Sequence, residues 1–589
     1  MNGYSTNFLK ISTVFLYLIL LFVIAVLIWV SFRGLDITDE SYYLVGYLQN
    51  IEHAYGLTYF HKIYNTFFGF LKLGIVEIRL LRIGLSIITS MMFAHSLSKY
   101  LRKSGVLTKN EWDVHFIFVC VSIGSFLGYT WLPQTLSYNI MSYLFSQGVV
   151  MCYLYGESIS SKSYKNIFKV LVGVFLGASF YNKFPNLVTS LAMLLPFSFL
   201  SRADLNVKKR IYSIGSDLLM YSIGILAISM ALFKNNVFAS FADYLSLISP
   251  DTNQTGSTDY FEIYSKDFNE LFTRMIPYLW ITCIYGILSF FTVYNTKTVI
   301  LKKFMEIFPI LFVLVFIYVN QSYMGGISRK NLHFDFYLIS TLLFLIIVFT
   351  HKSELGHNFY KLFLICIFLF SFLSGGLGTN NGLTGQFMIY MAFLIAALLV
   401  VAMSLRKSYL YILASIIVCV SASQIVTGMI FDPYREVHGI KAQKFEANNL
   451  KGFNHLMLDS ATYDLKKKLN TVRKLSAQHV FVYSHQTGIA LLTEKTPYGF
   501  GWYSPWNPHF CSKLIENAEQ VKEEDIIFII PDKLKMHPDV QNSLSKRGVN
   551  FPENYSILQQ IKFEDCQNGN NILLNIFVHN TIKYNNYKQ

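Results

Sequence analysis

The sequence predicts a mainly α-helical membrane protein, in which a polytopic bundle of transmembrane helices is followed by a small C-terminal α/β domain. The 589-residue chain is 53% hydrophobic and only 14% charged, so it has too little polar surface for a water-soluble particle of this size. Apolar runs of bilayer-spanning length repeat along residues 1–430. Residues 431–589 have a different composition, rich in charges and turn residues.

The apolar runs predict about 13 helices, because each run is long enough to cross roughly 30 Å of hydrocarbon. The first run covers residues 11–32. It is too long for a signal-peptide core and lacks a cleavage pattern, so we expect it to remain as a membrane anchor. The other runs are 83–101, 114–131, 138–155, 167–181, 184–200, 211–233, 273–294, 304–320, 334–350, 359–377, 386–404 and 409–430.

The distribution of Lys and Arg predicts the orientation of these helices. Basic residues gather in the loops after every second helix and are sparse in the alternate loops. Positive loops mark the cytoplasmic side, so we expect a multi-pass protein of the plasma (inner) membrane with a cytoplasmic N-terminus. The first outer loop (33–82) and the C-terminal domain would then be periplasmic or extracellular. The loop is also expected to carry short interfacial helices.

The net charge of +14 has the same explanation. Residues 431–589 hold 19 Lys and Arg against 16 Asp and Glu, a net +3, which leaves +11 in the membrane part. Most of the basic excess is therefore a topology signal, and we expect no nucleic-acid partner. The sequence also lacks a phosphate-binding GxxxxGK[ST] loop and a Cys/His cluster, which argues against an ATP-driven pump and a zinc site.

The C-terminal part, 431–589, is predicted to be a soluble α/β domain. Strand-like runs at Val480–Ser484, Ile526–Ile530 and Ile572–Val578 alternate with helix-compatible stretches such as Ser460–Leu475. Cys511 and Cys566 also lie in this part, in a compartment that permits disulfides, and the sequence leaves their pairing open.

Three acids follow the first apolar run: Asp36, Asp39 and Glu40. One interpretation is helix capping, with Thr38 as N-cap and the two later acids facing the helix dipole. The other is chemistry, because paired acids at a membrane surface can supply a general base or ligands for a divalent cation.

Several cations, Lys62, Arg79 and Arg82 of the first outer loop among them, break the charge rule by lying on the predicted outer side. Snorkelling or a solvated turn would explain each one singly. Their number, near an acidic pair, favours a site that binds phosphate. The candidates for binding the donor phosphate are Lys62, Lys183, Arg329 and Lys330.

The sequence resembles the GT-C membrane glycosyltransferases, and within them the protein O-mannosyltransferases and the lipid A aminoarabinose transferases. The shared frame is many spans, an acidic pair directly after the first span, and a C-terminal exoplasmic domain. The aminoarabinose enzymes carry an acid before the lysine of the second stretch, where this chain has His61, and prolines after it, where this chain has Ile63 and Tyr64. This departure argues against a metal ligand at that position. The resemblance rests on Asp39-Glu40-Ser41-Tyr42-Tyr43, Tyr59-Phe60-His61-Lys62, Leu132–Asn139, Lys183-Phe184-Pro185 and Gly378-Thr379-Asn380-Asn381.

The resemblance implies transfer of a sugar, with inversion, from a polyprenyl phosphate to a glycan, lipid or protein acceptor on the outer face of the membrane. Asp39 and Glu40 would be catalytic, with Asp39 orienting or deprotonating the acceptor hydroxyl. No cofactor is required, although a divalent cation at these acids would fit the chemistry. The expected substrate-binding residues are Asp36, Tyr42, Tyr43, His61, Asn139 and Asn380.

Two other functions are compatible with a polytopic chain. An O-antigen-type polysaccharide polymerase also has many spans and a large outer loop, but it gives no account of the acids directly after the first span. A transporter would place ionisable residues at mid-membrane, where Asp217 is among the few candidates, and often shows inverted repeats. The sequence does not identify the sugar or the acceptor.

Overall fold

The structure is a computed structural model. It describes residues 2–49, 58–107, 110–233, 260–294, 299–320, 329–356, 358–376, 387–431, 433–435, 438–503, 505, 508–565 and 569–582.

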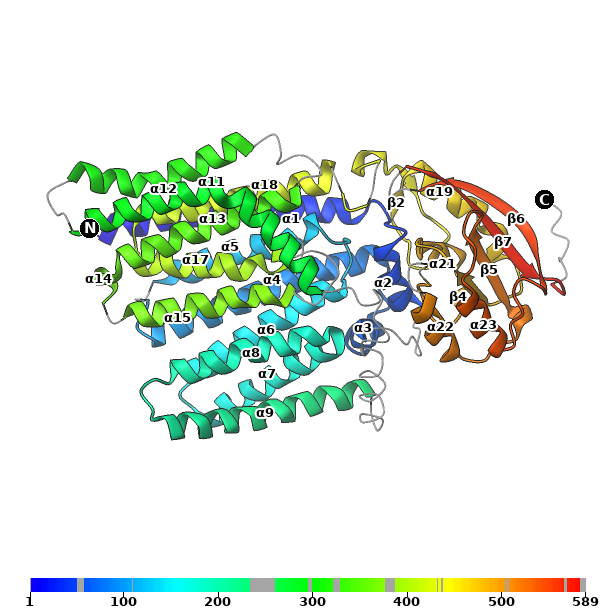
Figure 1. Ribbon diagram of the computed structural model, residues 1–589, viewed down its shortest axis with the longest axis horizontal. Coiled ribbons are helices and arrows are strands. Elements are labelled where there is room, and N and C mark those ends of the chain that lie inside the picture. Colours follow the sequence, from blue (N-terminus) through cyan, green and yellow to red (C-terminus); the bar gives the residue numbers. More distant parts are fainter. Residues whose placement is uncertain are drawn as a thin grey trace.

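Long helices occupy the positions of all thirteen apolar runs, so the predicted helical bundle is confirmed (Figure 1). Three of them are extended by short 3-10 turns, η2 (Phe126–Thr130), η5 (Phe372–Gly376) and η6 (Met388–Tyr390). The bundle helices are α1 (Asn2–Ser31), α4 (Ile75–Lys103), α5 (Glu111–Ser125), α6 (Tyr138–Ser158), α7 (Lys162–Asn182), α8 (Phe184–Ser201), α9 (Val207–Phe233), α11 (Tyr260–Tyr294), α12 (Val299–Asn320), α13 (Arg329–Thr350), α15 (Asn358–Ser371), α17 (Met391–Leu405) and α18 (Ser408–Phe431).

Within the described residues, eight helical segments are long and apolar enough to cross a membrane. Their surfaces bear large exposed apolar side chains, as expected of a lipid-facing bundle. These segments are Asn7–Ser31, Glu111–Thr130, Phe184–Ser201, Val207–Phe233, Tyr264–Thr292, Asn358–Gly375, Met388–Leu405 and Ser408–Phe431.

Two short helices follow α1 at the end of the bundle that adjoins the C-terminal domain (Figure 1). Helix α2 (Asp39–Leu48) is largely buried, and helix α3 (Phe60–Phe68) is amphipathic. Helix α3 buries Phe60 and Ile63, whereas Phe67 is exposed, as is Phe70 in the following turn η1 (Gly69–Leu71). Short helices were expected in this loop, and two are present. Their interfacial position stays a prediction.

The C-terminal domain is built on a five-stranded mixed sheet of order β4-β3-β5-β7-β6. Strand β3 runs parallel to β4 and β5, and β7 runs antiparallel to β5 and β6. The three strands predicted from sequence correspond to β3, β5 and β7. The strands are β3 (His479–Val482), β4 (Thr496–Pro497), β5 (Ile526–Pro531), β6 (Tyr555–Glu564) and β7 (Asn571–His579), with a separate pair β1 (Phe445–Glu446) and β2 (Met457–Leu458).

Helices cover both faces of this sheet, because successive strand residues point to opposite sides. Val480 and Ile527 belong to the apolar cluster that includes α19–α21, whereas Phe481 and Phe528 belong to the cluster of α22 and α23. The predicted α/β class is therefore confirmed. The helices are α19 (Ser460–Lys468), α20 (Asn470–Arg473), α21 (Gly488–Thr493), α22 (Pro508–Glu516) and α23 (Pro538–Lys546).

The C-terminal domain contacts the first loop through backbone hydrogen bonds. The Met457 amide donates to Phe32, and the Gly34 amide donates to Met457, each at 2.8 Å. The Gly488 amide, at the start of α21, donates to the carbonyl of Ile37 at 2.7 Å. These contacts place the segment that carries the three acids between the bundle and the domain.

The disulfide between the two C-terminal cysteines stays untested. Cys511 is buried in α22, and Cys566 lies outside the described residues.

We predict that Gly488→Ala loosens the contact between the domain and the first loop. A Cβ atom at this position would lie 2.6 Å from the Ser41 hydroxyl and 2.8 Å from the Ile37 Cα, closer than side chains pack. Amide hydrogen exchange should become several-fold faster in the segments around residues 37–41 and 487–490. Gly84→Ala in α4 is the control, because a Cβ there meets nothing within 4 Å. Unchanged exchange in the Gly488 variant would contradict the prediction.

Candidate functional site

A reciprocal hydrogen-bond pattern starts helix α2. The Asp36 carboxylate accepts the Thr38 amide at 2.8 Å and the Glu40 amide at 3.1 Å, and the Glu40 carboxylate accepts the Asp36 amide at 3.4 Å. This is the logic of a capping box, in which two side chains satisfy the free amides of a helix start. The expected capping by the Thr38 side chain is wrong, because its hydroxyl donates to Asp36 instead. Asp36 thus shapes the loop, and burial raises its pKa to about 7.

Glu40 forms a buried ion pair with Arg79 of α4. The Arg79 Nε and Nη2 atoms donate to its two carboxylate oxygens at 2.9 and 2.6 Å, and the side chains are 2% and 0% exposed. Arg79 also donates to the carbonyls of Ser31 and Gly34. Every Glu40 oxygen therefore already has a charged donor. This environment gives Glu40 a role in fixing the loop to the bundle, and a catalytic role for it stays a prediction.

Asp39 has a different environment, because its side chain is 23% exposed. The Arg435 Nη1 atom donates to its Oδ1 at 2.7 Å, and the Tyr434 hydroxyl donates to its Oδ2 at 2.7 Å. The same Arg435 nitrogen donates to the Thr38 hydroxyl at 2.7 Å. The segment that follows α18 therefore holds Asp39 through both of its oxygens.

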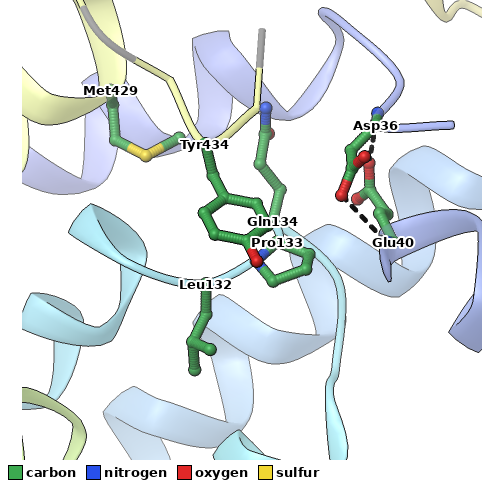
Figure 2. Close-up of a pocket in the computed structure, with 7 residues that line it drawn as sticks. All are labelled: Asp36, Glu40, Leu132, Pro133, Gln134, Met429 and Tyr434. Carbon is green, nitrogen blue, oxygen red and sulfur yellow. Dashed lines mark hydrogen bonds between the residues drawn. The ribbon is translucent and has the colours of Figure 1, made fainter. Parts of the chain in front are cut away.

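A narrow pocket lies beside these residues. Figure 2 shows the Tyr434 ring beside Pro133 and Gln134, with Asp36 and Glu40 on the other side of the pocket. The cavity measures about 10 Å³, which is room for about one water molecule. In this conformation the pocket is closed to a sugar-sized ligand. Its walls are Asp36, Glu40, Leu132, Pro133, Gln134, Met429 and Tyr434.

The two expected substrate-binding tyrosines of α2 lie in an aromatic cluster. The ring of Tyr43 is 5.1 Å from Phe60 and 6.0 Å from Tyr138, at the start of α6. Tyr43 also shares a face of α2 with Asp39, four residues before it. Burial raises the pKa of Tyr43, and Tyr138 and Asp39 raise it further. Tyr42 instead faces the C-terminal domain, with its ring 5.5 Å from that of Trp502.

His61 and Lys62, both on α3, have separate environments. His61 is buried and packs on Gly46 of α2, where a Cβ atom would lie 3.0 Å from the His61 Cβ. Burial, and then the charge of Lys62, lowers the His61 pKa to about 4, so the ring is neutral at pH 7. The Lys62 ammonium lies 4.4 Å from the ring centre of Phe233 in α9. These contacts make His61 a packing residue and keep Lys62 at the domain-side end of the bundle.

Lys183 lies between α7 and α8 at the same end. It is 5% exposed, and its ammonium group donates to the carbonyl of Gly375 at a long 3.4 Å. Burial lowers its pKa to about 7. The neighbouring Asn182 amide donates to the Tyr138 carbonyl at 2.6 Å, which brings Lys183 close to the start of α6.

Asn139, also at the start of α6, is 4% exposed, and its buried Oδ1 atom has no hydrogen-bond partner among the described residues. The same holds, within those residues, for the Oδ1 atoms of Asn182 and Asn186. A buried amide oxygen without a donor is costly, so this cluster is suited to accept hydrogen bonds from hydroxyl groups.

Three of the expected site residues cannot be placed in the site. The side chains of Arg329 and Lys330, in the first turn of α13, and the whole of Asn380 lie outside the described residues. Their roles stay predictions.

The structure adds residues that were not identified from the sequence. Tyr434 and Arg435 reach Asp39 from 395 and 396 positions away, and no local motif marks them. Arg79 and Arg82 had been recognised from the sequence as cations on the predicted outer side, but their structural partners had not. Arg82 is buried, stacks 3.5 Å from the Tyr129 ring centre and donates to the Pro133 carbonyl, so it shapes the pocket wall.

Comparisons with known proteins gave one result. No protein-family profile matches the sequence, and no curated protein matches it. The fold is similar to the crystal structure of ArnT from Cupriavidus metallidurans bound to undecaprenyl phosphate. The identity is 12%, the match covers 96% of this chain and 98% of that one, and the TM-score is 0.40.

We predict that Arg79→Met destabilises the protein by about 3–5 kcal/mol, because it leaves the Glu40 carboxylate buried without a charged partner. The double variant Arg79→Met, Glu40→Met should recover part of this loss. Thermal and denaturant unfolding of the purified protein measures both. Arg33→Met is the control, because the half-buried Arg33 stacks on Trp29 and has no acidic partner in the described part of the chain. Equal losses in the two single variants would contradict the assigned role of the ion pair.

Proposed function

We propose that this protein is a membrane glycosyltransferase that moves a sugar from a polyprenyl phosphate to an acceptor hydroxyl. The observation that carries the proposal is the position of Asp39. This carboxylate lies at one end of a membrane-spanning bundle and is partly exposed. It is held by Arg435 and is not part of a buried ion pair in the core. The neighbouring acids have structural roles, because Asp36 caps α2 and Glu40 pairs with Arg79. Asp39 is therefore the acid best placed to act as a general base.

In the proposed reaction the Asp39 carboxylate accepts the proton of the acceptor hydroxyl. The hydroxyl oxygen forms a bond to the anomeric carbon while the bond from that carbon to the phosphate oxygen breaks. Polyprenyl phosphate leaves with the electron pair, and the anomeric centre is inverted. A positioned general base of this kind contributes roughly a 10²–10⁴-fold acceleration.

The leaving phosphate needs nearby positive charge. Lys183 suits this role, because it lies close to the start of α6 and its hydrogen bond within the described part of the chain is a long one, to the Gly375 carbonyl. An anion beside it would favour its charged form, which burial otherwise disfavours. Lys62, Arg329 and Lys330 remain further candidates at the domain-side end. The role of Lys183 does not depend on Arg329 and Lys330, whose side chains lie outside the described residues.

The buried amide cluster suits the sugar. The Oδ1 atoms of Asn139, Asn182 and Asn186 are acceptors, and sugar hydroxyls are donors. Tyr43 links this cluster to Asp39, because it packs near Tyr138 and shares a face of α2 with Asp39. The donor would therefore extend from Lys183 past Tyr43 to the base.

A divalent cation does not fit the acids as they stand. Arg79 compensates the Glu40 charge, and Arg435 compensates that of Asp39. Among the described residues no cluster of His, Cys, Asp and Glu is suited to hold a metal ion. We therefore propose a mechanism in which Arg79 and Arg435, and not a metal ion, neutralise the charges of these acids.

The orientation of the chain is part of the proposal. The basic residues of the loops opposite the C-terminal domain place that end of the bundle in the cytoplasm by the positive-inside rule. The acids and the domain would then face the periplasm or the exterior. The acceptor would be a glycan, lipid or protein of the cell envelope.

A transporter is less suited to the structure. Asp217, the mid-membrane candidate, is paired with Arg202 at 2.6 Å and with Lys169. A carboxylate that is neutralised in this way supports helix packing better than ion passage.

We predict that Asp39→Asn lowers transfer by at least about 100-fold, because the amide cannot accept the acceptor proton. The assay follows polyprenyl phosphate released from lipid-linked sugars of the host membrane, measured by mass spectrometry, so the sugar need not be known. Asp204→Asn, an exposed acid at the opposite end of the bundle, is the control and should keep full activity. Full activity in the Asp39 variant would refute the proposed function.

We predict that Lys183→Ala weakens the binding of undecaprenyl phosphate about tenfold, the effect of losing one charge-assisted hydrogen bond. Binding to the purified protein in nanodiscs gives the dissociation constant. Lys162→Ala, at the exposed start of α7, should leave it unchanged. Equal affinity in the wild type and the Lys183 variant would remove Lys183 from the site.

A further inference from the structure

Both oxygens of Asp39 are occupied by one segment, Pro433–Arg435, which we call the strap. Arg435 occupies Oδ1 and the Tyr434 hydroxyl occupies Oδ2, each at 2.7 Å. Each carboxylate oxygen has two lone pairs, and one of those on Oδ2 already accepts the Tyr434 hydroxyl. An acceptor hydroxyl that uses this position on Asp39 must therefore displace Tyr434.

The contact made by Tyr434 has the chemistry of the contact that an acceptor would make. A hydroxyl group donates a hydrogen bond to the carboxylate at 2.7 Å, within the range from which a general base takes a proton. Asp39 uses its other oxygen for a cation that holds it in position. The arrangement is that of a base with a hydroxyl already bound.

Tyr434 also closes the pocket. Its ring is one of the pocket walls, and the cavity left beside it holds about one water molecule (Figure 2). Withdrawal of this ring would add the volume of a phenol side chain to the cavity. Acceptor entry at this pocket therefore requires the strap to move.

The backbone of the strap is strained at Arg435. Arg435 has φ 55°, in the left-handed region that residues with a Cβ atom adopt rarely. Such a conformation persists only where surrounding contacts hold it. Here the contacts that hold it are those of Arg435 with Asp39 and Thr38 and that of Tyr434 with Asp39. The conformation of the strap thus depends on the same carboxylate that it covers.

We propose that the Tyr434 hydroxyl occupies the position of the acceptor hydroxyl on Asp39, so that the strap is a built-in competitor that an acceptor must displace. This inference rests on the proposed function and adds the acceptor position and its regulation to it. In the closed state the Tyr434 hydroxyl holds the position on Oδ2 that an attacking water would need, which protects the lipid-linked sugar from hydrolysis.

The Tyr434 hydroxyl is protonated in the closed state. Burial raises the pKa of its phenol, and the charge of Asp39 raises it further, so the group donates its hydrogen bond to Asp39. The test below distinguishes a placeholder from an acceptor.

The test uses Tyr434→Phe in the full-length protein and measures polyprenyl phosphate released from lipid-linked sugars without an added acceptor. Water can then take the place of the Tyr434 hydroxyl on Oδ2, give up a proton to Asp39 and attack the anomeric carbon, which releases free sugar and polyprenyl phosphate. We expect this hydrolysis to rise at least about tenfold over the wild type, and Asp39→Asn to abolish it in either background. Tyr503→Phe, which removes the hydrogen bond of another buried tyrosine in the C-terminal domain, should leave it unchanged.

Two results would overturn the inference. Hydrolysis that stays equal or falls in Tyr434→Phe would make Tyr434 a support for Asp39. A peptide mass showing sugar attached to Tyr434 would make it an acceptor.

A second readout does not depend on activity. We expect trypsin to cleave after Arg435 mainly when the strap leaves Asp39, because Arg435 is otherwise bound to Asp39 and Thr38. Cleavage at this bond should therefore be several-fold faster in Tyr434→Phe and in Asp39→Asn than in the wild type or Tyr503→Phe. Equal cleavage rates would refute the strap even if the enzyme is a glycosyltransferase. Full transfer activity in Asp39→Asn would refute the proposed function, and the cleavage rates would still decide whether the strap opens.

Discussion

The buried ion pair between Glu40 and Arg79 is the interaction on which the arrangement of the site depends. An unpaired charge in the interior is strongly unfavourable, so these two side chains hold each other and the elements that carry them. Arg79 also binds three carbonyls at and just after the end of α1, those of Ser31, Arg33 and Gly34, which joins α1, α2 and α4 at one point. Because Glu40 is fixed inward, the adjacent Asp39 is directed toward the C-terminal domain. The position of one acid thus determines the exposure of the other.

The C-terminal domain completes this arrangement from the other side. Gly488 and Met457 bind the backbone of the first loop, and the strap binds Asp39 itself. The loop is therefore held by the bundle through its buried side chains and by the domain through its backbone. A site of this kind can keep a carboxylate in place at a membrane surface, where the first loop by itself has little core to bury. It can also be opened by movement of the strap alone, without disturbing the ion pair beneath it.

Several features of the fold could be predicted from local patterns. Span-length apolar runs mark helices because only helices satisfy every backbone group in lipid, and thirteen helices lie where the runs are. The apolar β-rich runs at 480–484, 526–530 and 572–578 likewise became strands β3, β5 and β7. Asp39 and Asp36 were recognised as special because three acids directly after a span are unusual. Which acid has a structural role and which is available for catalysis could not be predicted, since no local sequence pattern indicates that Arg79 pairs with Glu40.

The sequence by itself determined the membrane bundle, the α/β class of the C-terminal part and the end of the bundle where the acids gather, because these follow from hydropathy, periodicity and charge along short stretches of chain. Only the tertiary structure decided that Glu40 is buried in an ion pair and that Asp39 is partly exposed at the site. That choice depends on Arg79, 39 positions after Glu40, and on Tyr434 and Arg435, more than 390 positions after Asp39. Contacts between residues so far apart arise from the packing of whole elements, and no local pattern records them.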